Sequence, residues 1–229
     1  MFLASFATGY WQANCYVVAL PGVDQCVIVD PGQDSAAGVR SVIAENRFEP
    51  RAILLTHGHY DHVADAAQLA DDYNVAVYIH PADRHLLSNP TAGLSSDGAA
   101  VVRKVIGENM ALPARVEPYP LDRLLNLARL DFAVSHAPGH TAGSVLISLG
   151  FSGHRSIRSL VFTGDVVFAG SVGRTDLPGG NAEVMRRTLS EVVLGLPDTA
   201  ALLPGHGEQT TMAVERAENP YLQPSFLRN

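Results

Sequence analysis

Four side chains that bind metal ions well lie within six positions of the segment LLTHGHYDHVAD, residues 54–65: His57, His59, Asp61 and His62. Imidazole and carboxylate groups are ligands for zinc, iron and manganese. His57 and His59 are separated by one residue, so in a turn both can approach the same ion. Asp61 and His62 follow half a turn later and point elsewhere. The cluster therefore favours two adjacent ions over one.

Three later segments offer further ligands in matching contexts. Each combines an apolar run, a turn containing glycine and one metal-binding side chain: HAPGHTAGS (136–144) with His140, LVFTGDVVF (160–168) with Asp165, and LLPGHGE (202–208) with His206. Glycine allows the backbone to approach closely and to adopt positive φ angles. An ordinary set of polar loops is the competing interpretation. Imidazoles and carboxylates crowded together without a metal would, however, leave one another unsatisfied.

The remaining histidines are predicted to lie outside this cluster. His80, His85 and His154 stand apart from other metal-binding side chains, so structural or surface roles are favoured for them. His136 precedes His140 by four residues at the end of a strand, and we expect it to pack behind the site.

The apolar pattern predicts strands alternating with helices, and it places the histidine cluster between a strand and a helix. The first half is expected to hold strands at 14–20, 26–29, 52–56 and 75–79, with helices at 35–46 and 62–72. The second half is expected to hold strands at 130–136, 144–149, 159–163 and 200–203, with helices at 181–194 and 211–218. Such halves indicate one α/β domain over 1–229, with two sheets face to face and helices outside. In sheets of this kind, functional crevices lie at the carboxyl ends of strands.

Residues 86–118 are rich in small residues and proline and show no clear period. We predict a variable excursion over the surface, which helps to shape the substrate pocket.

Charge and composition restrict the partners. The net charge is −7 and no run of lysine and arginine reaches three residues, so nucleic acid is not expected as a partner. No apolar run is long enough for a membrane span, and the first residues lack the basic start of a secretory leader. A cytoplasmic location is therefore expected. The two cysteines, Cys15 and Cys26, are expected to be reduced thiols in the core.

The order of these motifs, HxHxDH followed by single His, Asp and His in turns, resembles the metallo-β-lactamase-fold hydrolases. The resemblance extends from ANCYVV and IVDPG near the start to PGHG near the end. It implies an αβ/βα sandwich of two mixed sheets with the metals at one edge. It further implies a first metal held by His57, His59 and His140, and a second held by Asp61, His62 and His206. Asp165 would bridge the two.

Within that superfamily, the chain looks most like the short glyoxalase II-like proteins of bacteria. The segments GRTD and ERAENPYL and the aspartate at position 165 carry this likeness. Such proteins resemble hydroxyacylglutathione hydrolases, which cleave a hydroxyacyl thioester such as S-D-lactoylglutathione. Full-length glyoxalase II enzymes bind glutathione through a helical C-terminal domain. Only 23 residues follow His206 in this sequence. The thiol carrier is therefore left open.

The expected reaction is a hydrolysis that uses two divalent ions, with zinc favoured and iron or manganese as alternatives. Two ions about 3.5–4 Å apart can lower the pKa of a water from 15.7 to roughly 7. Asp61 is the predicted catalytic residue, because it can bind a metal and orient that water. Tyr60, Phe168 and Arg174 are predicted to contact a small-molecule thioester. The oligomeric state is not predicted.

Two rival functions stay open. Persulfide dioxygenases share the HxHxDH cluster and a GRTD segment, and use one iron held here by His57, His140 and Asp165. They typically lose the last histidine, so His206 favours a dinuclear hydrolase. A lactonase of the same fold is the rival within hydrolysis.

Overall fold

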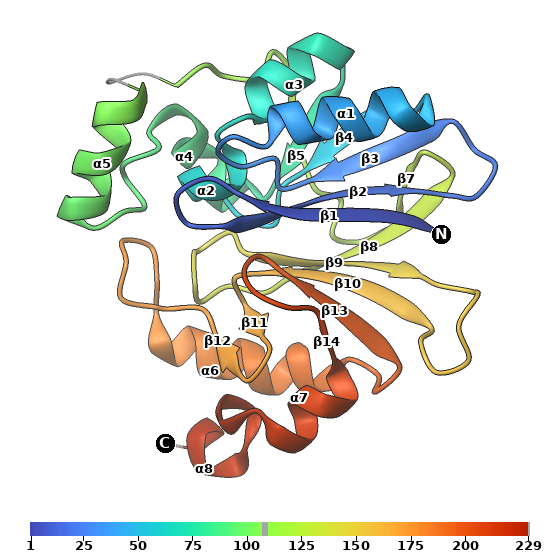
Figure 1. The fold of residues 1–229 in the computed structure, drawn as a ribbon. Helices are drawn as coiled ribbons and strands as arrows, with labels where there is room; N and C mark the ends of the chain where they lie inside the picture. Colours follow the sequence, from blue (N-terminus) through green and yellow to red (C-terminus); the bar gives the residue numbers. More distant parts are fainter. Residues whose placement is uncertain (107–109, 229) are drawn as a thin grey trace.

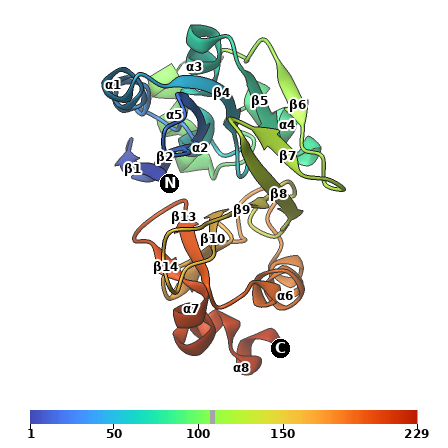
Figure 2. The same cartoon turned by 90° about the vertical axis from the view of Figure 1, so that its right-hand side faces the viewer.

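The computed structural model describes residues 1–106 and 110–228, which form four layers in the order helix, sheet, sheet, helix (Figures 1 and 2). The first sheet has six strands in sequential order: β1 (Phe2–Thr8), β2 (Ala13–Ala19), β3 (Gln25–Val29), β4 (Glu49–Leu54), β5 (Ala76–Ile79) and β6 (Val116–Pro118). Its first three strands pair antiparallel and β3 to β6 pair parallel, so the sheet is mixed.

The second sheet also has six strands and is also mixed. Their order is β14 (Thr210–Thr211), β13 (Ala200–Pro204), β10 (Ser159–Gly164), β9 (Val145–Gly150), β8 (Leu130–His136) and β7 (Leu125–Leu127). Only β10 and β13 pair parallel. A separate hairpin is formed by β11 (Val167–Phe168) and β12 (Ser171–Val172). The αβ/βα sandwich of two mixed sheets is thereby confirmed.

Helices cover the outer face of each sheet (Figure 2). The first sheet carries α1 (Ala36–Asn46) and α3 (Ala66–Tyr73), and the second carries α6 (Ala182–Glu191) and α7 (Met212–Glu218). The chain closes with α8 (Pro224–Leu227). Three apolar clusters fill the spaces between layers. The central one joins side chains such as Tyr16, Phe132 and Phe162 from both sheets. Because apolar surface is buried on both faces of each sheet, strand ends are held rigidly.

The predicted strands and helices are present with small shifts at their ends, and two predictions need correction. The helix expected at 62–72 is broken into α2 (Tyr60–Val63) and α3. The break follows from Asp65, whose amide donates to Pro31 O and whose carboxylate accepts from the amide of Ala36. Because both groups of Asp65 bond to the segment that leads into α1, the backbone leaves the helical path at Asp65.

The segment 86–118 is more regular than expected. It contains the end of α4 (Arg84–Ser88), all of α5 (Ser96–Ile106) and strand β6, which extends the first sheet. Ala99 and Val102 are buried and lie three residues apart, which is the spacing of one helix face. Residues 107–109 lie outside the described part of the chain.

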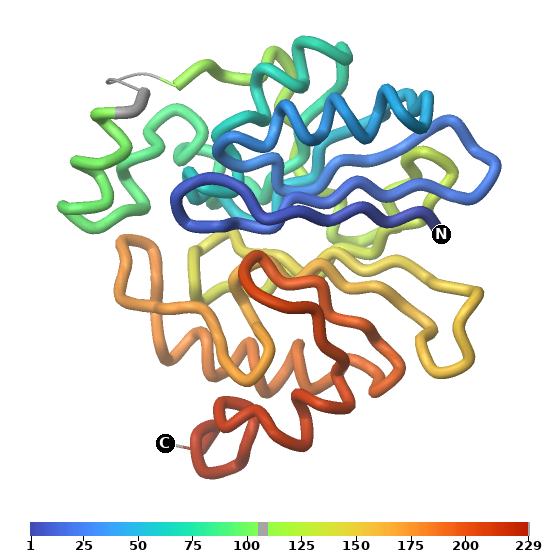
Figure 3. Tube along the Cα trace, in the orientation of Figure 1, coloured from blue at the N-terminus to red at the C-terminus, as the bar shows by residue number. Residues whose placement is uncertain are grey.

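The ends of both sheets bring distant segments together. Figure 3 shows the turn after β1, helix α5 and the loop before α6 on the same side of the molecule. The carboxyl ends of the parallel strands β3, β4 and β5 face this side, as do those of β10 and β13. Among the described residues, no helix has the length and apolar character that crossing a membrane requires.

Candidate metal centre

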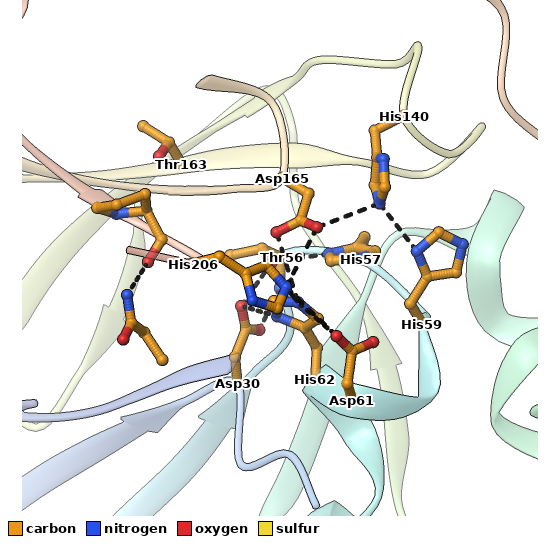
Figure 4. A network of polar contacts seen from close by, with 12 residues as sticks. Asp30, Thr56, His57, His59, Asp61, His62, His140, Thr163, Asp165 and His206 are labelled. Carbon is orange, nitrogen blue, oxygen red and sulfur yellow. Dashed lines mark hydrogen bonds and ion pairs between the residues drawn. The ribbon is translucent and has the colours of Figure 1, made fainter. Parts of the chain in front are cut away.

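All seven predicted ligands lie where strands end at this edge. His57 and His59 follow β4, and Asp61 and His62 belong to α2. His140 lies in the loop between β8 and β9, Asp165 follows β10, and His206 follows β13. Figure 4 shows these side chains converging from both sheets. Their roles as ligands stay a prediction, but the structure brings all seven together.

Two groups of three match the predicted division between two ions. In the first group, one ligand atom each from His57, His59 and His140 lies within 4.8 Å of the others. The closest pair is His59 Nδ1 and His140 Nε2, which are 2.8 Å apart. In the second group, the same limit holds for Asp61, His62 and His206.

The three ligand atoms of the second group lie 3.3 to 3.7 Å apart. His206 Nε2 lies 3.3 Å from both Asp61 Oδ2 and His62 Nε2. Two ligands at 2.0–2.1 Å from zinc in tetrahedral geometry are separated by about 3.4 Å. The observed separations therefore match two atoms bound to one ion.

Asp165 lies between the two groups, as a bridging residue requires. Its Oδ2 is 3.5 Å from His140 Nε2 in the first group and 3.5 Å from His206 Nε2 in the second. Its Oδ1 is 3.4 Å from His62 Nε2 and has no hydrogen-bond partner. A buried carboxylate oxygen without a partner is costly, and a cation would satisfy it.

Hydrogen bonds fix the tautomers of two imidazoles in the first group. His140 Nδ1 donates to the carbonyl oxygen of Arg174 at 2.8 Å, which leaves Nε2 with its lone pair facing the centre. Thr56 Oγ1 donates its one proton to Asp30 at 2.6 Å, so His57 Nδ1, 3.1 Å from that hydroxyl, must be the donor. His57 Nε2 is then a buried acceptor without a partner. These lone pairs are what a metal ion needs.

Asp30 supports both groups, although the sequence places it only in the IVDPG segment and not among the predicted ligands. Its Oδ2 accepts from Thr56 Oγ1 and, at 3.1 Å, from His62 Nδ1, while Oδ1 accepts from the Thr56 amide at 2.7 Å. One buried carboxylate thus orients His57 through Thr56 and orients His62 directly. Its backbone has φ +48°, a conformation that aspartate tolerates better than most residues.

Asp83 is a second supporting residue that the sequence motifs do not reveal. Its buried carboxylate accepts from the Gly58 amide at 2.9 Å, the Thr141 hydroxyl at 2.6 Å and the Gly143 amide at 2.7 Å. The first donor belongs to the turn of His57 and His59, and the other two lie just after His140. Asp83 therefore ties together the two turns that supply the first group.

Asn14 and Tyr16 of β2 hold the loop of His206. The Asn14 side chain donates to the carbonyls of Pro204 and Gly207, both at 2.9 Å. The Tyr16 hydroxyl donates to Pro204 O at 2.6 Å. The segment ANCY thus joins the first sheet to the last ligand turn, a role that its apolar pattern alone does not reveal.

The pKa values of the clustered histidines show that this site favours a bound positive charge. Burial, with the neighbouring His62 and His59, holds the pKa of His57 well below its usual range, and burial beside His140 lowers the pKa of His59 to about 3. Burial alone would lower the pKa of His62, but the charges of Asp165 and Asp61 outweigh it and raise that pKa to about 10. The carboxylates therefore attract a positive charge, which a proton supplies when no metal is bound.

A cavity of about 320 Å³ opens beside the ligands. Phe168 and Arg174 line it, and their contact with a substrate stays a prediction. Tyr60 does not line it: its ring is buried and packs edge-on against Trp11, with ring centres 6.3 Å apart. The first turn of α2 points it inward, and Trp11 takes the place on the wall. Leu94, from the segment predicted to shape the pocket, also lines the cavity.

The other histidines lie outside both groups. His80 and His136 stack on each other with ring centres 4.0 Å apart, and His136 Nε2 donates to Ala142 O at 2.9 Å. His154 accepts from the amides of Ser156 and Ile157 in an exposed turn. The packing role predicted for His136 matches this contact, although its side chain is exposed.

Comparisons with known proteins agree with this geometry. An uncharacterized protein of Mycobacterium bovis is 39% identical over 97% of this chain and 98% of its own length. Hydroxyacylglutathione hydrolase GloC of Haemophilus influenzae is 30% identical over 93% of each chain. Among solved structures, BLEG-1 B3 metallo-beta-lactamase has a TM-score of 0.80 at 30% identity, covering 97% of this chain and 100% of its own.

TTHA1623 in a di-iron-bound form has a TM-score of 0.75 at 32% identity, covering 96% of this chain and 100% of that one. The sequence profile of the Metallo-beta-lactamase superfamily matches residues 8–206, which include every predicted ligand. With two sheets, a shared ligand edge and this match, the chain belongs to the metallo-beta-lactamase superfamily of metal-dependent hydrolases.

Proposed function

We propose that this protein is a dinuclear metal-dependent thioesterase of the glyoxalase II type. Its substrate would be a hydroxyacyl thioester, such as a lactoyl thioester, of a low-molecular-weight thiol. The observation that carries this proposal is the position of Asp165, whose Oδ2 lies 3.5 Å from a histidine of each group. The likeness to GloC over nearly the whole chain supports the thioester as substrate.

The ligand residues fit two metal ions, and different residues would activate the water and hold the substrate. Two bound divalent ions would supply Lewis acidity and bring the pKa of a water molecule near neutrality. Positive charge beside Asp61 lowers the pKa of its carboxyl group against the effect of burial, and bound divalent ions would act in the same direction. Asp61 lines the cavity and would hold the attacking water by accepting its hydrogen bond. The wall around Phe168 and Arg174 would hold the thioester.

Zinc is the proposed metal, because the Irving–Williams order places it above iron and manganese at equal availability. Iron is the main alternative, because the crystal structure of TTHA1623, a protein 32% identical to this chain, is of a di-iron-bound form.

The presence of His206 supports this proposal over a persulfide dioxygenase. A single iron on His57, His140 and Asp165 would give His206 no role, yet its Nε2 is 3.3 Å from Asp61 and its loop is held by Asn14. A lactonase would use the same ligands and is separated only by substrate.

Beta-lactam hydrolysis is a second candidate, favoured by the overlap with BLEG-1 at a TM-score of 0.80. The residues that line the cavity would accommodate either a beta-lactam or a thioester. A chromogenic cephalosporin therefore belongs in the same assay panel.

Metal content per chain, measured on protein purified without added metal, tests the proposal together with a lactoyl-thioester assay. About two metals with thioester cleavage would support it. One iron per chain, oxygen uptake with a persulfide and no thioester cleavage would replace it with the dioxygenase. Two metals with cleavage of the cephalosporin or a lactone, but of no thioester, would assign a different hydrolase.

A further inference from the structure

The walls of the cavity are mainly apolar and come from four separate segments. Trp11 lies in the turn after β1, Leu94 precedes α5, Phe168 belongs to β11, and Leu177 lies in the loop before α6. All four side chains are half-buried, so each presents apolar surface that a ligand could cover. These segments lie together on one side of the molecule (Figure 3).

The residues that line the cavity include two carboxylates, three imidazoles and one permanent cation. Among the described residues that line the cavity, that cation is Arg174. Its Nε and Nη2 atoms each donate to Asp176 at 2.7 Å, one to each carboxylate oxygen. Such two-point pairing satisfies the guanidinium face that would otherwise recognise a ligand carboxylate.

Arg174 and Asp176 are close in sequence, and both stay charged at physiological pH. Arg174 and Asp176 are two residues apart in one loop, so the carboxylate is always close to its partner. Hydrogen bonding to Arg174 lowers the pKa of Asp176 to about 2, which keeps the aspartate charged at physiological pH. An anionic ligand that used this face of Arg174 would therefore have to displace a carboxylate that the chain itself supplies.

We propose that the cavity selects thioesters of an uncharged carrier thiol, and that Asp176 disfavours anionic carriers by occupying Arg174. This inference rests on the proposed thioesterase function and specifies its substrate class. A neutral carrier loses little on entering a wall made of Trp11, Leu94, Phe168 and Leu177. A carrier of the glutathione type brings two carboxylates, and the arginine on the wall is already paired.

Trp11 is the one tryptophan of the chain, so its fluorescence reports binding at this wall directly. The probes are two stable thioethers with the same alkyl group, S-hexyl-N-acetylcysteamine and S-hexylglutathione, titrated into the metal-loaded protein. We expect the neutral thioether to bind at least about fivefold more tightly, because the anionic one must break an exposed ion pair. Equal or tighter binding of S-hexylglutathione, or no binding of either probe, would overturn the proposal.

Asp176→Asn tests the role of the ion pair. It frees Arg174 and should improve S-hexylglutathione binding about three- to tenfold, with little change for the neutral probe. The matched control is Glu183→Gln, which frees Arg187 on α6, outside the cavity, and should change neither affinity. An unchanged ratio of the two affinities in Asp176→Asn would show that the pair does not set carrier choice.

Leu94→Ala tests the apolar wall and should weaken binding of both hexyl thioethers about fivefold through lost apolar contact. Leu112→Ala, which truncates an exposed leucine away from the cavity, is its control. If the protein is not a thioesterase, the hydrolysis assay gives a result that differs from the loss of carrier selectivity. Both lactoyl thioesters, of N-acetylcysteamine and of glutathione, would then resist hydrolysis whatever the thioether affinities. Hydrolysis that favours the glutathione thioester would instead reject only the carrier selectivity.

Discussion

The Oδ2 atom of Asp30 accepts a hydrogen bond from Nδ1 of His62 at 3.1 Å, and both side chains are buried. The same oxygen accepts from Thr56 Oγ1, which in turn accepts from His57. One carboxylate therefore sets the tautomer of a histidine in each group of ligands. This arrangement predicts that both metals respond to a change at a residue that binds neither.

Asp30→Asn tests this relationship with almost no change in size. Asparagine tolerates φ +48°, but its amide group donates where the carboxylate accepted. His62 then has to accept at Nδ1, which places its proton on Nε2 and blocks that ligand atom. We expect metal affinity to fall about 10- to 100-fold while the fold is retained. Competition with a chelator measures the affinity, and near-UV circular dichroism checks the fold. Unchanged affinity would show that His62 does not need this tautomer.

His206→Ala removes a ligand of the second group alone. We expect the metal content to fall from about two to about one per chain, with a large loss of hydrolysis, because the first group keeps its three histidines. His136→Ala is the matched control, since His136 lies outside both groups and its loss should leave two metals. Atomic emission on both variants gives the result. Full activity in His206→Ala would contradict the dinuclear centre.

Gly205→Ala probes how closely the backbone approaches the ligands. A Cβ at this position would meet Asp165 Oδ1 and would lie 2.6 Å from His62 Cε1. Because both neighbours are ligands held by other contacts, we expect loss of metal with only a modest loss of stability. Gly195→Ala is the control, since a Cβ there meets nothing within 4 Å. Metal content equal to that of the control would show that the turn relaxes without disturbing the centre.

The ligand positions could be predicted because each depends on local sequence, namely a strand end, a glycine turn and a metal-binding side chain. Asp30 and Asp83 could not be identified in the same way. Their partners lie 25 to 60 residues away, and an aspartate after a strand has many other uses. A carboxylate that holds other ligands in place is recognised only when its donors are known.

Local sequence also fails to predict strand β6 and the position of the Tyr60 side chain. Strand β6 has three residues and ends in Pro118, so it carries neither the length nor the alternation of a typical strand. Proline is tolerated there because β6 is an edge strand. The prediction that Tyr60 contacts the substrate follows from its place among the ligands. A side chain in a first helical turn can face either way, and here Trp11 covers it.

The two cysteines predict how stability changes at alkaline pH. Cys15 and Cys26 are both buried in the core, as expected from the sequence. Burial raises the pKa of Cys26 from 9.0 to about 12, and burial together with Asp30 raises that of Cys15. In the native state both thiols should therefore resist alkylation at pH 8, and they should react once the chain is unfolded in urea.

Between pH 9 and pH 12 the unfolded chain releases the Cys26 proton while the native chain retains it. The unfolded state thus binds fewer protons, so the free energy of unfolding falls as the pH rises, by at most about 1.4 kcal/mol per pH unit for this thiol. Below pH 9 both states keep the proton and the effect vanishes. Urea unfolding of Cys26→Ala, which has no thiol to titrate at this site, should show a shallower decline between pH 9 and pH 10.5 than the unaltered protein. Parallel declines would mean that the Cys26 thiol titrates alike in the native and unfolded states, despite its burial in β3.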